Sequence, residues 1–143
     1  MTLDEASQIV ASHFRAHEVP QAGLDATHRA TALIEGEQVA FEFDVATSRL
    51  RTSVLIYRWR EWAVAGLLEA LRREAGPGGS DVGGGELLYL PERKTLSLAR
   101  TYASPPTLAA FEREQARLRE ACTLWRTEVF ARVAERVRHP VAG

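Results

Sequence analysis

The sequence has little of several features that would point to a particular class of protein. It contains one cysteine, Cys122, which excludes an internal disulfide and fits a reducing compartment. Its longest apolar stretch, from Trp62 to Leu68, is far too short to span a bilayer. No apolar run with a basic flank opens the chain, as a signal peptide would require. We therefore expect a soluble, cytoplasmic protein with no membrane partner.

The chain also lacks a charge excess of either sign. Its formal net charge is -1 over 143 residues, so bulk electrostatics favours neither nucleic acid nor a membrane surface as partner. Only one of the 18 basic residues, Lys94, is a lysine, which we interpret as the mark of a GC-rich genome rather than of arginine-based recognition. Four arginines surround Trp59 in a pattern that could stack nucleic-acid bases, but nearby acidic residues can pair with them. We expect a solvated surface on which these charged residues form salt bridges with one another: Arg49, Arg51, Arg58, Arg60, Glu42, Asp44 and Glu61.

No catalytic motif is present. Gly79 to Gly84 has the glycine spacing of a phosphate-binding P-loop, but Gly85 stands where the lysine should be. The composition of residues 76–85 instead predicts a flexible loop. Cys122 falls on the apolar stripe of a predicted helix, where a small buried hydrophobe is its default role. We expect no enzymatic activity, no catalytic residues and no cofactor.

Two histidines lie in the first predicted helix. His13 and His17 are four residues apart in a predicted helix, a spacing that is able to hold a metal ion. A third ligand would have to come from elsewhere, and His28 and Glu18 are the nearby candidates. No HExxH pattern occurs. We expect a surface histidine and a partly buried one rather than a metal site.

The first part of the chain predicts a helix followed by a three-stranded meander. Thr2 and Glu5 form a capping box, and Pro20 and Gly23 end the helix. The period then changes from helical to alternating, which indicates half-buried strands. Gly36-Glu37 suits a type II′ hairpin turn. The predicted strands cover residues 29–35, 38–45 and 50–58.

A strongly apolar helix is predicted next, over Trp59 to Ala75. Val64, Leu67, Leu68 and Leu71 mark one face at helical spacing, and other apolar residues extend that surface around the cylinder. A helix that is apolar over most of its circumference is buried on more than one side. We expect Val64→Asp or Leu68→Asp to destabilise the fold.

The rest of the chain predicts a hairpin and a long helix. After the glycine-rich loop come strands over residues 86–90 and 95–102. The last helix starts at Ser104, with Pro105 in its first turn, and would run about 50 Å if unbroken. Residues 139–143 form a short tail. The sequence thus predicts one α+β domain, residues 1–143, with the order α-β-β-β-α-β-β-α and an antiparallel sheet packed by helices.

With this element order, most of the sequence resembles the class I type III secretion chaperones, the CesT-like family. The resemblance is clearest in GGGELLYLPERKTLSLARTYA, which contains the hairpin pair Leu96-Ser-Leu98, and in LREACTLWRTEVF with its late Trp125. It implies a homodimer without enzymatic activity that holds an extended segment of a partner protein. YbjN-like proteins share the fold, so a regulatory or accessory domain that acts by protein–protein interaction outside a secretion system is the alternative.

The resemblance also implies where contacts would be made. The middle helix would supply the dimer contact, through Trp59, Trp62, Ala65, Gly66 and Glu69, and Trp62→Asp should mainly split the dimer. The first helix and the meander would supply grooves for the extended partner segment, through Val10, Phe14, Leu33, Leu55 and Tyr57.

Overall fold

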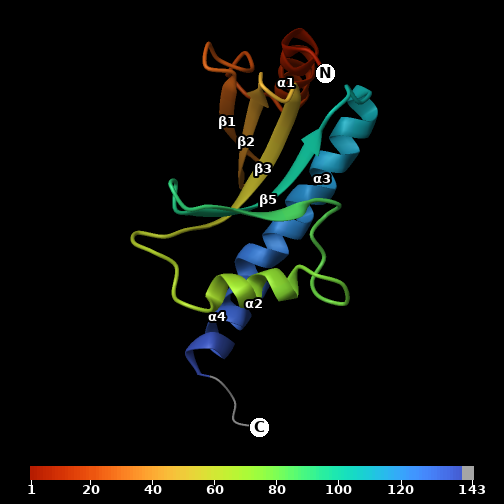
Figure 1. Cartoon of the computed structure of the whole chain (residues 1–143). Helices are drawn as coiled ribbons and strands as arrows, with labels where there is room; N and C mark the ends of the chain where they lie inside the picture. Colours follow the sequence, from red (N-terminus) through yellow and green to blue (C-terminus); the bar gives the residue numbers. More distant parts are fainter. Residues whose placement is uncertain (140–143) are drawn as a thin grey trace.

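The computed structural model describes residues 1–139, and its elements follow the predicted order around one antiparallel sheet (Figure 1). The five strands lie in the order β1-β2-β3-β5-β4. The remaining residues of the predicted tail, 140–143, lie outside the described part. The strands are β1 (Arg29–Ile34), β2 (Glu37–Asp44), β3 (Arg49–Arg58), β4 (Glu86–Leu90) and β5 (Thr95–Tyr102).

The three-stranded meander is confirmed, and its apolar alternation faces the core. Val39, Phe41 and Phe43 of β2 are all buried, because period-two side chains share one face of a strand. The first turn differs from the prediction. Ile34 pairs with Glu37, which leaves Glu35 and Gly36 as the loop with φ of 50° and 79°. Two consecutive positive φ values make this a type I′ turn rather than type II′.

Helices α1 (Leu3–Ala16) and α3 (Leu108–Leu124) pack on one face of the sheet and on each other. The predicted capping box is confirmed: the Thr2 side chain accepts from the Glu5 amide, and the Glu5 carboxylate accepts from the Thr2 amide. The core between the two layers contains aromatic and aliphatic side chains, among them Phe14, Phe41, Phe111, Leu98 and Leu118. Within residues 1–139, the opposite face of the sheet carries no helix (Figure 1).

The last helix is continuous but changes its winding. Thr107, not Ser104, caps α3 by accepting from the Ala110 amide, so Pro105 and Pro106 precede the helix instead of opening it. A π-helical turn, η1 (Trp125–Val129), then leads directly into α4 (Phe130–Arg138). π-turns insert a residue into a helix and often re-aim side chains. Here the turn starts at the fully buried Trp125.

The middle helix is shorter than predicted and lies elsewhere. Helix α2 (Leu67–Glu74) begins at Leu67 rather than Trp59, because Trp59 prolongs the strand by donating its amide to the Lys94 carbonyl at 2.9 Å. Gly66, with φ of 83°, then redirects the chain into the helix. Helix α2 packs against α4 rather than against the sheet (Figure 1). The predicted helical face is therefore only partly right, and Val64 lies outside the helix.

The glycine-rich loop after α2 is not a free linker. Gly83 is buried against α3, and a Cβ there would lie 2.7 Å from the Arg117 carbonyl oxygen. A Cβ on Gly85 would lie 2.3 Å from the Ala99 carbonyl oxygen. Glycine is needed at both positions because the backbones approach so closely. The predicted loop is thus packed against α3 and β5 at these two glycines.

Candidate protein-binding surfaces

An apolar groove lies beside the end of β3, between the segment that follows this strand and α4. Its volume is about 250 Å³. Chain segments far apart in sequence meet here because α4 continues past the sheet and α2 packs against it. The groove is lined by Tyr57, Trp59, Val64, Leu67, Phe130, Ala134, Val137 and Arg138.

Three aromatic rings on one side of this groove contact one another. The ring centroids of Tyr57 and Phe130 are 4.4 Å apart, and Tyr57 and Trp59 are 5.0 Å apart. Trp59 also meets Tyr89 of β4 edge-on at 5.8 Å. Aromatic pairs at these separations add to the stabilisation that burial of their surface provides. The aromatic side of the groove is therefore preformed.

The segment between β3 and α2, whose Val64 lines the groove, carries large apolar side chains that remain in water. Trp62 is 69% exposed and Val64 is 64% exposed. The Lys94 ammonium lies 5.1 Å from the centre of the Trp62 ring, a cation–π contact that covers little of the indole. Large exposed apolar side chains beside an apolar groove favour an interaction site.

The residues proposed for a dimer contact fall into two environments. Trp59 is half-buried on the aromatic side of the groove, whereas Trp62, Ala65, Gly66 and Glu69 are exposed. They do not form a helical face, since helix α2 begins only at Leu67. They are instead a continuous segment that runs from the end of β3 into α2.

The residues proposed for partner binding divide differently. Val10 and Phe14 are fully buried on the inner face of α1, so in this structure they offer no surface to a partner. Their side chains pack into the core of their own chain. Leu33 on β1 is 71% exposed, and Leu55 is half-buried on the helix-free face of the sheet. Tyr57 lies in the apolar groove, with the residues expected at the dimer contact.

The helix-free face of the sheet is concave and lined by charge. A hollow of about 310 Å³ there includes four arginines around a single carboxylate, Glu42, among small side chains. Arg51 donates to the Glu42 carboxylate at 3.0 Å, Arg93 also donates to it, and Arg29 lies 4.0 Å away. Burial alone would raise the pKa of Glu42, but Arg93 first, then Arg51 and Arg29, lower it below its ordinary value. Of the salt-bridged surface predicted around Trp59, the pair of Arg51 and Glu42 is confirmed. Arg29 and Arg93 pair with Glu42 in addition, and Arg58 lines the same hollow.

Both outer strands of the sheet leave one edge without a partner strand within residues 1–139. Strand β1 pairs only with β2, and β4 pairs only with β5. Strand β4 is apolar on both faces: Leu87, Leu88, Tyr89 and Leu90 are all half-buried. An unpaired edge presents backbone donors and acceptors to which another extended chain can add. On the outer edge of β1, Arg29 already bonds to Asp25 and the Thr31 carbonyl accepts from the Gln21 side chain.

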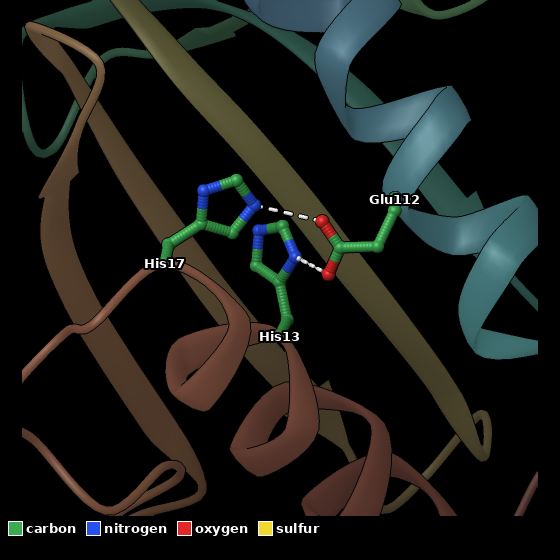
Figure 2. A group of neighbouring side chains, drawn as sticks. All are labelled: His13, His17 and Glu112. Atoms are coloured by element: carbon green, nitrogen blue, oxygen red, sulfur yellow. Dashed lines mark hydrogen bonds and ion pairs between the residues drawn. The ribbon is translucent and has the colours of Figure 1, made fainter.

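A cluster of two histidines and one carboxylate joins α1 to α3 (Figure 2). His13 Nδ1 lies 2.6 Å from Glu112 Oε1, and His17 Nε2 lies 2.7 Å from Glu112 Oε2. Burial lowers the pKa of the fully buried His13, although the hydrogen bond and charge of Glu112 oppose this effect. The third member comes from the last helix, not from His28 or Glu18 as the local sequence indicated.

Cys122 is a small buried hydrophobe, as predicted. Its side chain is fully buried, and its Sγ lies 3.3 Å from the Leu55 carbonyl oxygen. Burial raises the pKa of the thiol to about 12. A reactive cysteine needs a lowered pKa and some exposure. Cys122 has neither.

One buried charge was not indicated by the sequence. Glu37, at the start of β2, is buried, and its carboxylate accepts from Arg126 at 2.7 Å and from the Thr123 hydroxyl at 2.6 Å. These partners lie on the last helix, and no local pattern signals such a pair. A buried carboxylate requires partners of this kind because desolvation penalises its charge.

Comparison with solved structures identifies the fold. A chain of the HopA1–SchA chaperone–effector complex aligns with a TM-score of 0.63 and 16% identity, over 87% of this chain and 94% of that one. A chain of the ExsC–ExsE complex aligns with a TM-score of 0.67 and 16% identity, over 90% and 96%. A chain of the heterodimeric ExoU–SpcU complex from the type III secretion system of Pseudomonas aeruginosa aligns with 0.53 and 17%, over 84% and 93%.

The chain has the fold of the type III secretion chaperones. This confirms the resemblance that the hairpin and the late tryptophan indicated. No protein-family model matches the sequence, and no curated protein matches it. In the part of the chain that the structure describes, no helix is long and apolar enough to cross a membrane. The fold places the apolar groove at one end of the sheet and the helix-free face beside it.

Proposed function

We propose that this protein is a non-enzymatic chaperone or adaptor that acts as a homodimer and holds an extended segment of a partner protein. The single observation that carries the proposal is the apolar groove, with Trp62 and Val64 exposed on the segment that leads from β3 into α2. The structures with the same fold add support, since one is described as a chaperone–effector complex and another as a heterodimeric complex of a type III secretion system.

The groove, together with the exposed Trp62 and Val64, would bind a second copy of the chain. The exposed indole of Trp62 and the isopropyl group of Val64 lose water contact when a partner covers them, and burial yields about 25 cal/mol per Å². A second copy would present the same residues across a two-fold axis, since dimers of this type use one patch twice. In this arrangement Tyr57 belongs to the dimer contact rather than to the client surface.

The dimer proposal revises what Val64→Asp should do. Because Val64 is exposed and outside α2, the aspartate should leave the folded monomer intact and weaken self-association. Val45→Asp is a matched control, because Val45 is 62% exposed but lies in the β2–β3 loop. Light scattering after size-exclusion chromatography should give twice the 15.9 kDa chain mass for the wild type and for Val45→Asp.

Val64→Asp and Trp62→Asp should shift this mass toward that of one chain, with an unchanged circular dichroism spectrum. A wild-type protein that stayed monomeric at high concentration would end the dimer proposal. A dimer that both aspartate variants left intact would place the interface elsewhere, and the unpaired edge of β4 would be the next surface to test.

The client would bind along the helix-free face and the outer edge of β1 near Leu33, beyond the part of that edge where Asp25 and Gln21 already bond to Arg29 and Thr31. An added strand gains backbone hydrogen bonds from the edge, while side-chain hollows select its sequence. Leu33 and Leu55 offer apolar contacts there, and the four arginines of the hollow outnumber its one carboxylate. A segment that combines acidic and aliphatic residues suits this surface. Held extended, such a segment cannot fold or aggregate prematurely.

Co-purification from the native host, followed by mass spectrometry, would identify the client. Its disordered segment should then bind the purified chain, and Arg29→Glu and Leu33→Glu should weaken binding by about tenfold or more, which corresponds to 1.4 kcal/mol. Arg113→Glu is the control, because Arg113 is exposed on α3, the helix of the opposite face. Equal losses in all three variants, or none, would reject this location.

A further inference from the structure

Three side chains on α1 and α3 bring metal-ligating atoms together (Figure 2). His13, His17 and Glu112 each offer one ligand atom, and these atoms lie within 4.8 Å of one another. They are two imidazole nitrogens and a carboxylate oxygen, the donor set of many zinc sites with one open position. Neither the fold nor the proposed client binding requires such a cluster.

The ligands are held in place by the surrounding structure. His13 and His17 are one helical turn apart on α1, and their ring centroids are 4.6 Å apart. The ring of His13 is fully buried and contacts Phe111 edge-on at 5.1 Å and Phe41 at 5.7 Å. Preorganisation of this kind reduces the conformational entropy that binding has to overcome.

Solvent can reach two of these three side chains. The side chains of His17 and Glu112 are 19% and 27% exposed, so an ion can enter from outside and retain a water molecule as a further ligand. The buried imidazole of His13 then forms the inner wall of the site. This combination of one buried and two accessible ligands is what an open-coordination metal site needs.

Metal coordination can replace the hydrogen bonds that now hold the cluster together. His13 Nε2 has no hydrogen-bond partner in the part of the chain that the structure describes, so only Glu112 holds the proton on Nδ1. When an ion binds Nδ1, that proton can move to Nε2, and the ring stays neutral. Two ligand atoms on a tetrahedral zinc are separated by roughly 3.4 Å, given bonds of about 2.1 Å. The two imidazole nitrogens now contact different oxygens of Glu112, at 2.6 and 2.7 Å, and the three ligand atoms lie within 4.8 Å of one another. Rotation of the Glu112 carboxyl and of the partly exposed His17 ring can bring one oxygen and both nitrogens to the spacing that zinc needs.

We propose that His13, His17 and Glu112 form a binding site for a divalent transition-metal ion, with Zn²⁺ as the ion that fits the donor set. Mg²⁺ and Ca²⁺ fit poorly because they prefer all-oxygen ligands. The ion would join α1 to α3, which are linked otherwise by packing, across 99 residues of sequence. It would therefore stabilise the folded chain in proportion to its free concentration.

The test uses the full chain, freed of metal by a chelator. Zn²⁺ alone is titrated against it in competition with a chromophoric chelator, and the melting temperature is followed in parallel. We expect one ion per chain and a higher melting temperature. Co²⁺ in place of Zn²⁺ should give visible d–d absorption bands of a low-coordinate site, a signal that a hydrogen-bonded cluster does not produce.

The variants separate this site from others. His17→Ala and Glu112→Gln should weaken Zn²⁺ binding by at least roughly tenfold, whereas Glu112→His should restore it by supplying a third imidazole. His28→Asn is the matched control, because it removes a histidine outside the cluster and asparagine tolerates the positive φ of 64° found there. Glu112→Gln preserves size, and its circular dichroism spectrum shows whether the fold persists.

Two results would overturn the proposal. One is the absence of Zn²⁺ binding and of Co²⁺ bands in the folded wild type at micromolar metal. The other is binding that His17→Ala and Glu112→Gln leave intact. In either case the three residues are a hydrogen-bonded link between two helices and nothing more. Because the readout is metal itself, failure here leaves the chaperone proposal untouched.

Discussion

The indole Nε1–H of Trp125 donates a hydrogen bond of 2.9 Å to the backbone carbonyl of Asp81. Trp125 is fully buried where the last helix turns from α to π winding, and Asp81 lies in the glycine-rich loop. The contact therefore fastens the loop to the helix that covers the sheet. It explains why a segment with the composition of a linker is part of the packed structure.

Trp125→Phe should test the importance of this contact. The phenyl ring removes the donor and some buried volume, so the free energy of unfolding should fall by about 1–3 kcal/mol. Urea unfolding followed by circular dichroism would measure the loss. Trp62→Phe is the matched control, because Trp62 is exposed and its change should stay within about 0.5 kcal/mol. Similar values for the two variants would mean that the loop contact contributes little.

Gly85→Ala should be more disruptive than its size suggests. The new methyl group would lie 2.3 Å from the Ala99 carbonyl oxygen, a backbone atom that cannot rotate away. We expect destabilisation of about 1–3 kcal/mol from overpacking. Gly36→Asn provides the comparison, because a Cβ there meets nothing within 4 Å and asparagine tolerates its positive φ. A thermal melt in which Gly85→Ala matched the wild type would show that β4 shifts freely to make room.

Cys122 should be chemically inert in the folded chain. Its pKa of about 12 leaves almost no thiolate at neutral pH, and its side chain is fully buried. A disulfide reagent such as DTNB should therefore react slowly with the native protein and rapidly once denaturant is added. Rapid reaction without denaturant would mean that α3 opens from the sheet under native conditions.

The stability of the chain should depend on pH through His13. Burial lowers its pKa below the ordinary 6.5, against the opposing effect of Glu112, and the charges of His17 and Arg119 lower it further. The unfolded chain thus binds this proton more readily than the folded chain. The stability that His13 contributes is complete above pH 6.5 and is lost as the pH falls through 6.5 toward the folded pKa.

Denaturant unfolding at a series of pH values, with a chelator present, would measure this dependence. The free energy of unfolding should decrease as the pH falls from about 7.5 to 5. His13→Gln should make that decrease smaller, since the buried titrating ring is gone. Identical slopes for the variant and the wild type would assign the pH dependence to other groups.

Local pattern was enough for most of the elements. The capping box at Thr2 and the alternation of Val39, Phe41 and Phe43 depend on neighbours in sequence, so helix and strands were predicted within a residue or two. The prediction was wrong at Trp59, where the helical spacing of apolar residues indicated a helix but tertiary contacts favour an extended chain. The indole packs between Tyr57, Tyr89 and Phe130, and these contacts keep the chain extended.

The candidate surfaces depended more strongly on the tertiary structure. Val10 and Phe14 form an apolar stripe in sequence, and such a stripe can face either a partner or the core of the same chain. Both residues are buried in the core because of the position of α1 on the sheet, which the sequence did not indicate. In the same way, Val64 is exposed although its helical spacing predicted burial.

By itself, the sequence determined the α+β class, the element order and the absence of a catalytic motif, because helix caps and apolar periodicity act over a few residues. The tertiary structure decided which side chains from different elements come into contact. It brought Glu112 to two histidines 95 and 99 residues away, and Asp81 to Trp125 across 44 residues. Contacts at such separations arise when the whole core packs, and the energy of that packing is not contained in any short stretch of the chain.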